Sequence, residues 1–342
     1  MNVHEGDQIA AALASAGFSL AQKQETADII IFNTCTIRNT AEDKIISHIG
    51  NVHKEKRKGR PLTIAVVGCL SARDGVEKSL RQKFPLLDII LGTKDITELP
   101  KKLNATHTEG KTQSSENTII INYGCDNYCS YCIVPYVRGE LRHRPISEIA
   151  EDFQNLAPKQ NKITLLGQNV NSYKCPETGA NFVGLLERLC PLATNEINFL
   201  SSHPRDWTPE LTEFIAKTPQ MSRDIHLPVQ SGSDKILELM NRGYTATDYK
   251  TKVDFIRKLI PDARITTDII CGFPGETEDD FTATIDFVRE LRFNAAFIFP
   301  YSRRSGTKAD TMAGQLDTKI KKSRATKLIN IQKEISKCLS PQ

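Results

Sequence analysis

Runs of apolar residues alternate with segments of helical periodicity along most of the chain, and this alternation predicts the fold class. In the first hundred residues, runs of strand length lie at 28–35, 62–69 and 87–92. Segments with helical spacing lie at 4–16, 40–57 and 75–83. Buried strands that alternate with helices are typical of a parallel sheet covered by helices. We therefore expect an open α/β domain in this part of the chain.

The alternation resumes after a polar, turn-rich stretch at 101–118, which predicts a linker. Six further apolar runs lie at 118–124, 162–167, 196–201, 224–229, 264–272 and 295–300. Repeated β-α units with buried strands predict a barrel, and six units in place of eight predict an incomplete one. The expected organisation is an α/β domain at 1–103, a linker at 104–117, and a partial (βα)6 barrel with a basic helical tail at 118–342.

In both kinds of fold, ligands are expected at the carboxyl ends of the strands. Polar clusters follow five of the barrel strands, at 167–173, 201–204, 228–233, 271–276 and 300–307. In the N-terminal domain, Cys35 and Cys69 each end a strand. Taken alone, each of these two cysteines is explained equally well as a buried free thiol.

Composition and charge indicate the cellular location of the protein more clearly than its function. The 342 residues carry 45 Lys and Arg against 41 Asp and Glu, and the net charge of +4 is too small to indicate nucleic acid by itself. No apolar run reaches the roughly 18 residues of a transmembrane helix, and the first residues lack the features of a signal peptide. We therefore expect a cytoplasmic protein with no membrane partner. Nine cysteines, an odd number, favour metal, cluster or catalytic use over disulfides in that compartment.

Cys125, Cys129 and Cys132 form a C-x3-C-x2-C pattern just after the first barrel strand. A closed structural zinc site needs four ligands, and so does a ferredoxin-type cluster. Three thiolates on a four-iron cluster would leave one iron with an open coordination position for a substrate. The spacing and placement favour such a cluster, with zinc as the alternative.

This pattern, with Tyr131 before the last cysteine, resembles that of the radical S-adenosylmethionine (SAM) superfamily, and the resemblance extends over residues 118–310. It implies that Cys125, Cys129 and Cys132 hold a catalytic [4Fe-4S] cluster whose fourth iron binds the amino and carboxylate groups of SAM. It also implies cleavage of SAM to methionine and a 5′-deoxyadenosyl radical. An electron donor such as flavodoxin or ferredoxin would be the partner.

The continuation "GCDNYCSYCIVPYVRGELRHRP" is similar to the methylthiotransferases within that superfamily. The stretches "NTCTIRNTAEDK" and "VVGCLSAR" resemble the N-terminal domain of the same family, which implies an auxiliary [4Fe-4S] cluster on Cys35 and Cys69. The stretches "LLGQNVNSY" and "HLPVQSGSDKILELMNRGYT" are more similar to the tRNA branch than to the ribosomal-protein branch. The implied reaction is sulfur insertion and methylation at C2 of N6-isopentenyladenosine, beside the tRNA anticodon. A ribosomal-protein substrate is the alternative.

The remaining site predictions rest on position and resemblance. The segment Gly272–Glu276 resembles the one that lies along the adenine of SAM in this family, which gives Gly272, Pro274 and Gly275 a cofactor-binding role; a tight turn explains the same residues. Further cofactor-pocket candidates are Tyr131, Gln168, Asn169, Ser201, His203 and Gln230.

The resemblance also brings two departures. Family members hold the auxiliary cluster with three cysteines, and the resemblance places the first of them just before "MNVHEGD". A radical-SAM remnant that cleaves SAM without transferring sulfur is therefore a second hypothesis. Family members also continue into a small RNA-binding β-barrel beyond "IQKEISKCLSPQ", which would leave phosphate contacts to basic runs such as Lys319–Lys327.

Overall fold

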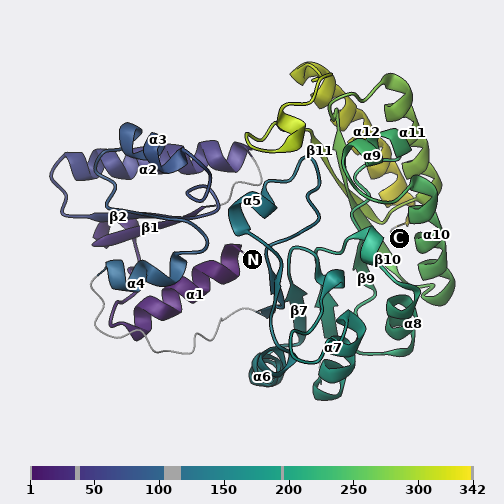
Figure 1. Ribbon diagram of the computed structural model, residues 1–342, viewed down its shortest axis with the longest axis horizontal. Coiled ribbons are helices and arrows are strands. Elements are labelled where there is room, and N and C mark those ends of the chain that lie inside the picture. Colours follow the sequence, from purple (N-terminus) through teal and green to yellow (C-terminus); the bar gives the residue numbers. More distant parts are fainter. Residues whose placement is uncertain (1, 35–38, 104–116, 194–195, 340–342) are drawn as a thin grey trace. The chain divides into compact units, whose positions relative to one another are not determined.

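The computed structural model describes residues 2–34, 39–103, 117–193 and 196–339, and the chain divides into two compact units (Figure 1). The first unit comprises residues 1–116 together with Ile133–Gly139. The second comprises Asn117–Cys132 together with Glu140–Gln342. No helix in the described part of the chain is long and apolar enough to cross a membrane.

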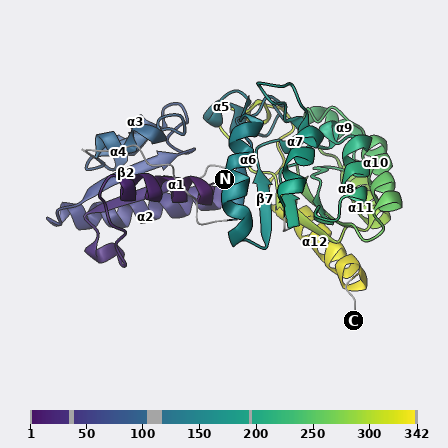
Figure 2. The same ribbon diagram turned by 90° about the horizontal axis from the view of Figure 1, so that it is seen from below.

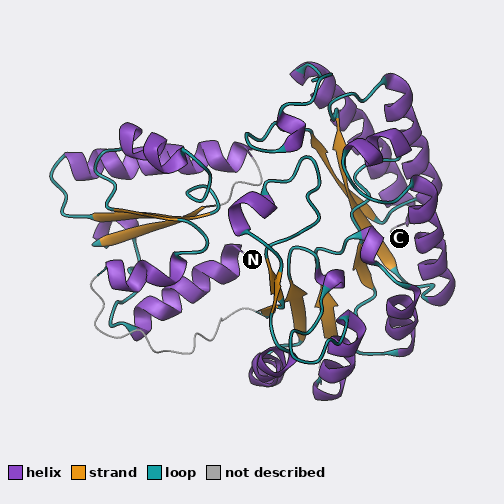
Figure 3. Ribbon diagram, in the orientation of Figure 1, coloured by secondary structure: helices purple, strands orange, loops and turns teal. Residues whose placement is uncertain are grey.

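The first unit is a three-layered α/β domain. Its parallel sheet has the order β1 (Ile29–Thr34), β2 (Thr63–Gly68), β3 (Ile89–Leu91). Helices α2 (Asn39–Arg57) and α3 (Val76–Lys83) cover one face, and α1 (Asn2–Ser15) and α4 (Leu99–Lys102) cover the other (Figure 3). The central strand β2 is apolar from Ile64 to Val67 because these residues are buried from both sides: Ile64 and Val66 pack beneath α2, whereas Ala65 and Val67 pack beneath α1.

A short segment that is distant in sequence completes this unit. Helix α5 (Val134–Arg138) follows the last of the three clustered cysteines, yet Ile133 and Val137 pack against Cys69 at the end of β2. The hydroxyl of Thr93 donates to the carbonyl of Val137 at 2.5 Å. The chain therefore passes from the cysteine loop into the first unit and returns to the second.

The second unit is an incomplete barrel of six parallel strands, and it confirms the predicted α/β fold class. The strands are β4 (Thr118–Ile120), β7 (Lys162–Leu166), β8 (Glu196–Phe199), β9 (Asp224–His226), β10 (Arg264–Cys271) and β11 (Ala295–Pro300). They form two three-stranded sheets, β4-β7-β8 and β9-β10-β11. A parallel bridge between Ile197 and Met221 joins the sheets, since the segment before β9 runs beside β8.

Helices on the outer side of these strands can be followed in Figures 1 and 2. They are α6 (Ile146–Leu156), α7 (Phe182–Leu189), α8 (Pro209–Lys217), α10 (Ala246–Leu259), α11 (Glu278–Leu291) and α12 (Thr318–Leu339). Strand β10 shows how the sequence builds this layer. Ile265 and Ile269 are fully buried in the core shared with the helices, whereas the intervening Thr266 and Asp268 are only partly buried.

The first predicted barrel strand is the clearest difference from the sequence-based expectation. Residues 118–124 form two short strands, β4 and β5 (Asn122–Tyr123), and β5 pairs antiparallel with β6 (Arg142–His143). The buried Asn122 begins β5. Its side chain turns toward the end of β7 and forms hydrogen bonds with the backbone there. The β5–β6 pair closes the base of the loop that carries the three cysteines.

Candidate active site at the carboxyl ends of the barrel strands

The loop that carries Cys125, Cys129 and Cys132 is fixed to the barrel by backbone hydrogen bonds. Cys125 and Cys129 are buried, and Cys132 is partly buried. The N–H of Ser130 donates to the carbonyl of Met240 at 3.0 Å, and the Ser130 carbonyl accepts from the N–H of Ala309 at 2.7 Å. The three thiols therefore have a fixed position at the end of the barrel where chemistry was expected.

Arg242 lies directly behind this loop, after helix α9 (Asp234–Leu239). It is 3% exposed, and its Nη1 donates to the Sγ of Cys129 at 3.2 Å and to the hydroxyl of Tyr131 at 3.2 Å. Its Nη2 donates to the Pro228 carbonyl at 3.0 Å, and its Nε donates to the Tyr244 hydroxyl at 2.9 Å. The guanidinium is thus a buried positive charge in direct contact with a thiol.

A second arginine contacts the outer side of the cysteine loop. The Nη2 of Arg205 donates to Oδ1 of Asn127 at 2.6 Å, and its Nε donates to Oδ1 of Asp206 at 2.9 Å. Asn241 donates from its side chain to the carbonyls of Asn127 and Tyr128 at 3.2 and 3.1 Å. Burial raises the pKa of the Cys125 thiol, and the backbone N–H of Asn127 and the Arg205 charge act in the opposite direction.

Gln168 and Asn169 follow β7, where Asn122 holds the turn. The Asn122 amide donates to the Asn169 carbonyl at 2.8 Å and accepts from the Gln168 N–H at 3.1 Å. A Cβ on Gly167 would lie only 2.1 Å from Oδ1 of Asn122, so only glycine fits there. Asn169 is buried and donates to Asp206 at 2.5 Å, while its own Oδ1 has no partner among the described residues.

Ser201 follows β8, and Gln230 follows β9 and pairs with Ile269 of β10. Both have left-handed backbones, with φ of 68° and 74°, which are strained for residues other than glycine. The main chain of Gln230 bonds β10 on both sides, donating to Asp268 at 2.8 Å and accepting from Ile270 at 3.0 Å. Its Oε1 is buried and, within the described residues, without a partner.

His203 lies nearby as a neutral imidazole. Its Nδ1 accepts from the N–H of Arg205 at 3.2 Å, so the ring proton belongs on Nε2. Burial, with the charges of Arg242 and Arg205, lowers the pKa of His203 to about 2. The buried Nε2 is a donor with no acceptor in the described part of the structure.

The segment Gly272–Glu276 turns sharply after β10. Gly272 has a φ of 74°, and a Cβ there would lie 2.5 Å from Cγ of Lys321. The Glu276 carboxylate accepts from the Gly272 N–H at 2.7 Å and from Nη1 of Arg324 at 2.6 Å. Pro274 is buried inside the turn, and the N–H of Gly275, whose φ is 82°, donates to the Gly314 carbonyl at 3.0 Å. Helix α12 therefore determines the shape of this turn.

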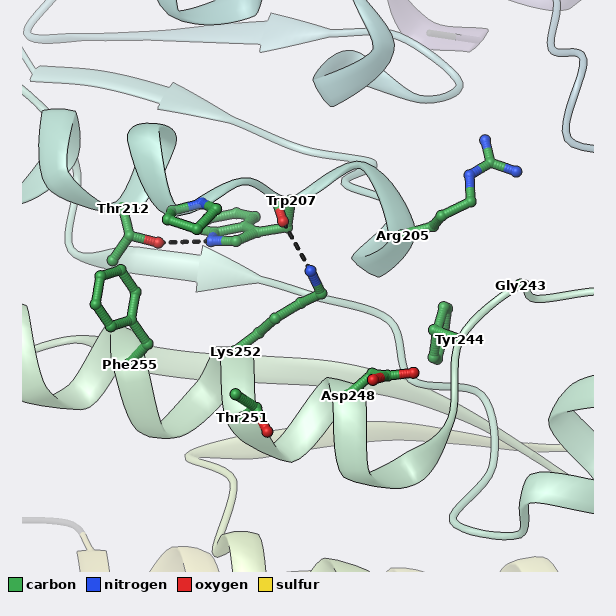
Figure 4. Close-up of a pocket in the computed structure, with 10 residues that line it drawn as sticks. Arg205, Trp207, Thr212, Gly243, Tyr244, Asp248, Thr251, Lys252 and Phe255 are labelled. Atoms are coloured by element: carbon green, nitrogen blue, oxygen red, sulfur yellow. Dashed lines mark hydrogen bonds between the residues drawn. The ribbon is translucent and has the colours of Figure 1, made fainter.

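A cavity of about 450 Å³ lies on the flank of the barrel, between α8 and α10 (Figure 4). Trp207 and Lys252 form its wall, where Trp207 Nε1 donates to Thr212 at 2.9 Å and Lys252 Nζ donates to the Trp207 carbonyl at 3.0 Å. Arg205 extends away from these side chains in Figure 4. No cysteine lines this cavity, so it does not contain the candidate cluster ligands.

Of the two candidate cluster ligands in the first unit, the structure describes Cys69 but not Cys35. Cys69 ends β2 and is 1% exposed. Arg138 of α5 lies beside it and pairs with Glu5, with 3.1 Å between Nη2 and Oε2. Burial would lower the pKa of Arg138, but hydrogen bonds to Glu5 and Cys69 raise it above its ordinary value. Cys35 lies outside the described residues.

Two family models match the chain. The model for the radical SAM superfamily matches residues 119–288, and the one described as uncharacterized protein family UPF0004 matches residues 1–92. The chain is 42% identical to the tRNA-2-methylthio-N(6)-dimethylallyladenosine synthase of Moorella thermoacetica, over 98% of this chain and 81% of the relative. The synthase of Natranaerobius thermophilus is also 42% identical, over 98% and 80%.

The chain belongs to the tRNA-2-methylthio-N(6)-dimethylallyladenosine synthase family. This confirms the methylthiotransferase resemblance drawn from the sequence. Among solved structures, the cobalamin-dependent SAM radical enzyme OxsB aligns with a TM-score of 0.55 and 14% identity, over 92% of this chain and 48% of that one. At this identity the likeness supports the fold alone, as a radical SAM barrel.

The cysteine loop fits the cluster that the synthase family implies. Among the described residues, no three His, Cys, Asp or Glu side chains converge around a point where a single metal ion could bind. Thiolates that hold a four-iron cluster bind different irons at separate corners, so they need not converge. The donor set is three thiols beside a buried cation, which suits an anionic iron-sulfur cluster.

Sequence reasoning did not single out Arg242, Arg324 or Glu276. Arg242 stands in the quoted "MNRGYT", but nothing in that string shows which way a side chain points. For Arg324 a signal existed: Lys321, Arg324, Leu328 and Ile335 share one face of a helix and are all buried. The basic run Lys319–Lys327 was predicted to contact RNA, yet two of its cations face inward.

Proposed function

We propose that this chain is a radical-SAM tRNA methylthiotransferase. It inserts sulfur at C2 of N6-isopentenyladenosine, the same base as N6-dimethylallyladenosine, beside the anticodon, and methylates that sulfur. The 42% identity to synthases of this name over 98% of the chain carries the proposal. The three-cysteine loop at the mouth of the barrel supports it from the structure.

The thiolates of Cys125, Cys129 and Cys132 would hold the [4Fe-4S] cluster, with SAM bound beside it. The bound cluster and SAM supply the one-electron chemistry that breaks the C2–H bond, which no side-chain base can break at neutral pH. The barrel would fix the position of the three thiolates, because Met240 and Ala309 hydrogen-bond the backbone of Ser130 in the cysteine loop. An electron donor of the flavodoxin or ferredoxin class would reduce the site.

The unpartnered buried polar atoms around the mouth would bind the polar groups of SAM. Oδ1 of Asn169 and Oε1 of Gln230 are acceptors suited to ammonium, hydroxyl or amine protons, and the His203 Nε2–H is a donor. Ser201 lies among them by position. The rigid Gly272–Glu276 turn, with Pro274 and Gly275, would lie along the adenine ring, since its backbone is already held by Glu276 and Gly314.

The target adenine must leave the stacked anticodon loop to reach the barrel mouth. Single-stranded loops allow bases to be splayed out at low cost. The first unit would hold a second [4Fe-4S] cluster on Cys35 and Cys69, and that cluster would supply the sulfur chemistry of the reaction. The proposal therefore has two clusters and two uses of SAM.

The test combines metal analysis with product analysis. Protein prepared without oxygen is assayed for iron and sulfide, and tRNA from cells lacking the gene is digested and examined by mass spectrometry after complementation. We expect the chain to restore 2-methylthio-N6-isopentenyladenosine and the Cys129→Ala variant to fail. Formation of 5′-deoxyadenosine with only unmodified N6-isopentenyladenosine would contradict the proposal and indicate the remnant that cleaves SAM without sulfur transfer.

A further inference from the structure

Arg242 is the most deeply buried charged group in contact with the cysteine loop, and its surroundings are unusual for a buried cation. Its guanidinium donates to one thiol, two phenols and one carbonyl. No carboxylate pairs with it anywhere in the described residues. A buried charge without a counter-charge is costly, so a buried arginine normally has an acidic partner.

Of these partners, only Cys129 is a candidate cluster ligand, and as a ligand it would be a thiolate. A phenol has an ordinary pKa of about 10. Both phenols are therefore neutral near pH 7. A thiolate that ligates iron carries the complementary charge, and the Nη1–Sγ distance of 3.2 Å already brings the two groups together.

We propose that Arg242 is a positioning residue that donates a charged hydrogen bond to a sulfur ligand of the cluster and thereby raises the reduction potential of that cluster. The proposal rests on the proposed function only in that Cys125, Cys129 and Cys132 hold a four-iron cluster. Reduction adds one electron and hence one negative charge to the cluster. A fixed cation at hydrogen-bond distance stabilises that more negative state, as hydrogen bonds to cluster sulfurs do generally.

A purely structural role has to be separated from this one. Arg242 also bonds the Pro228 carbonyl and the Tyr244 hydroxyl, and Tyr244 bonds the Val229 carbonyl at 2.8 Å. These contacts close the segment from Pro228 to Tyr244 on itself. Loss of Arg242 would therefore reduce stability whether or not the cluster is affected. A loss of stability or activity alone would not distinguish the structural role from an effect on the reduction potential.

The deciding measurement is a redox titration of the barrel cluster followed by electron paramagnetic resonance. The full chain carries Cys35→Ala and Cys69→Ala, so that only the barrel cluster contributes, and dithionite supplies the electron. In Arg242→Met we expect the reduced state to be disfavoured roughly tenfold, a shift of about 59 mV to more negative potential for a one-electron couple. Arg242→Lys keeps the charge and should recover part of the shift.

Tyr244→Phe is the matched control. It removes the phenol hydroxyl from Arg242 and from the Val229 carbonyl but leaves the Nη1–Sγ contact intact. We expect it to lower the thermal unfolding midpoint without moving the potential. Unchanged potentials in both Arg242 variants, with iron bound, would overturn the inference but leave the proposed function standing. Absence of bound iron in the parent protein would overturn both.

Discussion

Each unit of this molecule places a buried arginine beside a cysteine, but the two arginines differ in what balances their charge. In the first unit, Arg138 lies beside Cys69 and forms a buried ion pair with Glu5. In the second, Arg242 contacts Cys129 and, as far as the structure is described, has no carboxylate partner. The first arrangement is electrically balanced without any ligand, whereas the second leaves a net positive charge at the thiol.

This difference indicates different tasks for the two sites. The Arg138–Glu5 pair joins α5 to α1, residues 133 positions apart in sequence, and so closes the first unit around Cys69. The unbalanced charge of Arg242 favours an anion at the cysteine loop, as a redox cluster requires. We therefore expect mutation of the Arg138–Glu5 pair to act mainly through stability, and mutation of Arg242 to act mainly through the chemistry of the cluster.

The largest effect is expected from replacing one cysteine in each unit. Cys129→Ala should abolish both SAM cleavage and methylthio transfer, because the cluster at the barrel mouth is lost. Cys69→Ala should abolish methylthio transfer but leave SAM cleavage, since the barrel loop is untouched. Production of 5′-deoxyadenosine and of methylthiolated nucleoside by the two purified variants separates these outcomes. Loss of SAM cleavage in Cys69→Ala would contradict the division of tasks.

The next largest effect is expected at the Arg138–Glu5 pair. Glu5→Gln leaves a buried guanidinium without its counter-charge and should destabilise the first unit by about 3–5 kcal/mol. The double variant Glu5→Leu/Arg138→Met removes both charges and should be much closer to the parent protein. Denaturant unfolding monitored for each unit provides the measurement. If the double variant is no more stable than Glu5→Gln, the ion-pair explanation is wrong.

A third prediction concerns pH and the neutral His203 of the barrel mouth. Its folded pKa of about 2 lies below the ordinary value of 6.5, so above pH 6.5 the histidine is neutral in both states and its contribution to stability is complete. As the pH falls below 6.5, only the unfolded chain takes up the proton, and stability decreases. Between pH 6.5 and 5 the loss should be about 2 kcal/mol.

His203→Asn tests this prediction because asparagine cannot titrate. The difference in unfolding free energy between the parent protein and this variant should shrink or reverse as the pH falls from 7 to 5. A pH-independent difference would mean that His203 is not held neutral. Such a result would also weaken the comparison, since the low pKa reflects in part the charge of Arg242.

The sequence predicted the elements of both units well because apolar periodicity reflects burial directly. Strand β2 is apolar from Ile64 to Val67 because helices cover both faces, and β10 alternates because helices cover only one face. The three cysteines were readable from spacing alone. The arginines that contact the site could not be predicted in this way, because Arg242 is 113 residues from Cys129 and Arg324 is 48 residues from Glu276. Such pairings exist only once the chain is folded, and no local pattern encodes them.

The smallest predicted effect concerns the basic run Lys319–Lys327 of α12. In this run, buried lysines are expected to stabilise the fold, whereas exposed lysines are available to contact RNA. Lys321 is 8% exposed, with its Nζ 5.0 Å from the centre of the Tyr301 ring, whereas Lys322 is exposed. If the run contacts tRNA phosphates, Lys322→Ala should reduce the slope of log affinity against log salt by about 0.7–1. Lys321→Ala should lower stability and leave that slope unchanged. Filter binding of tRNA at several salt concentrations measures both slopes, and equal slopes in the parent protein and Lys322→Ala would exclude this lysine from the RNA interface.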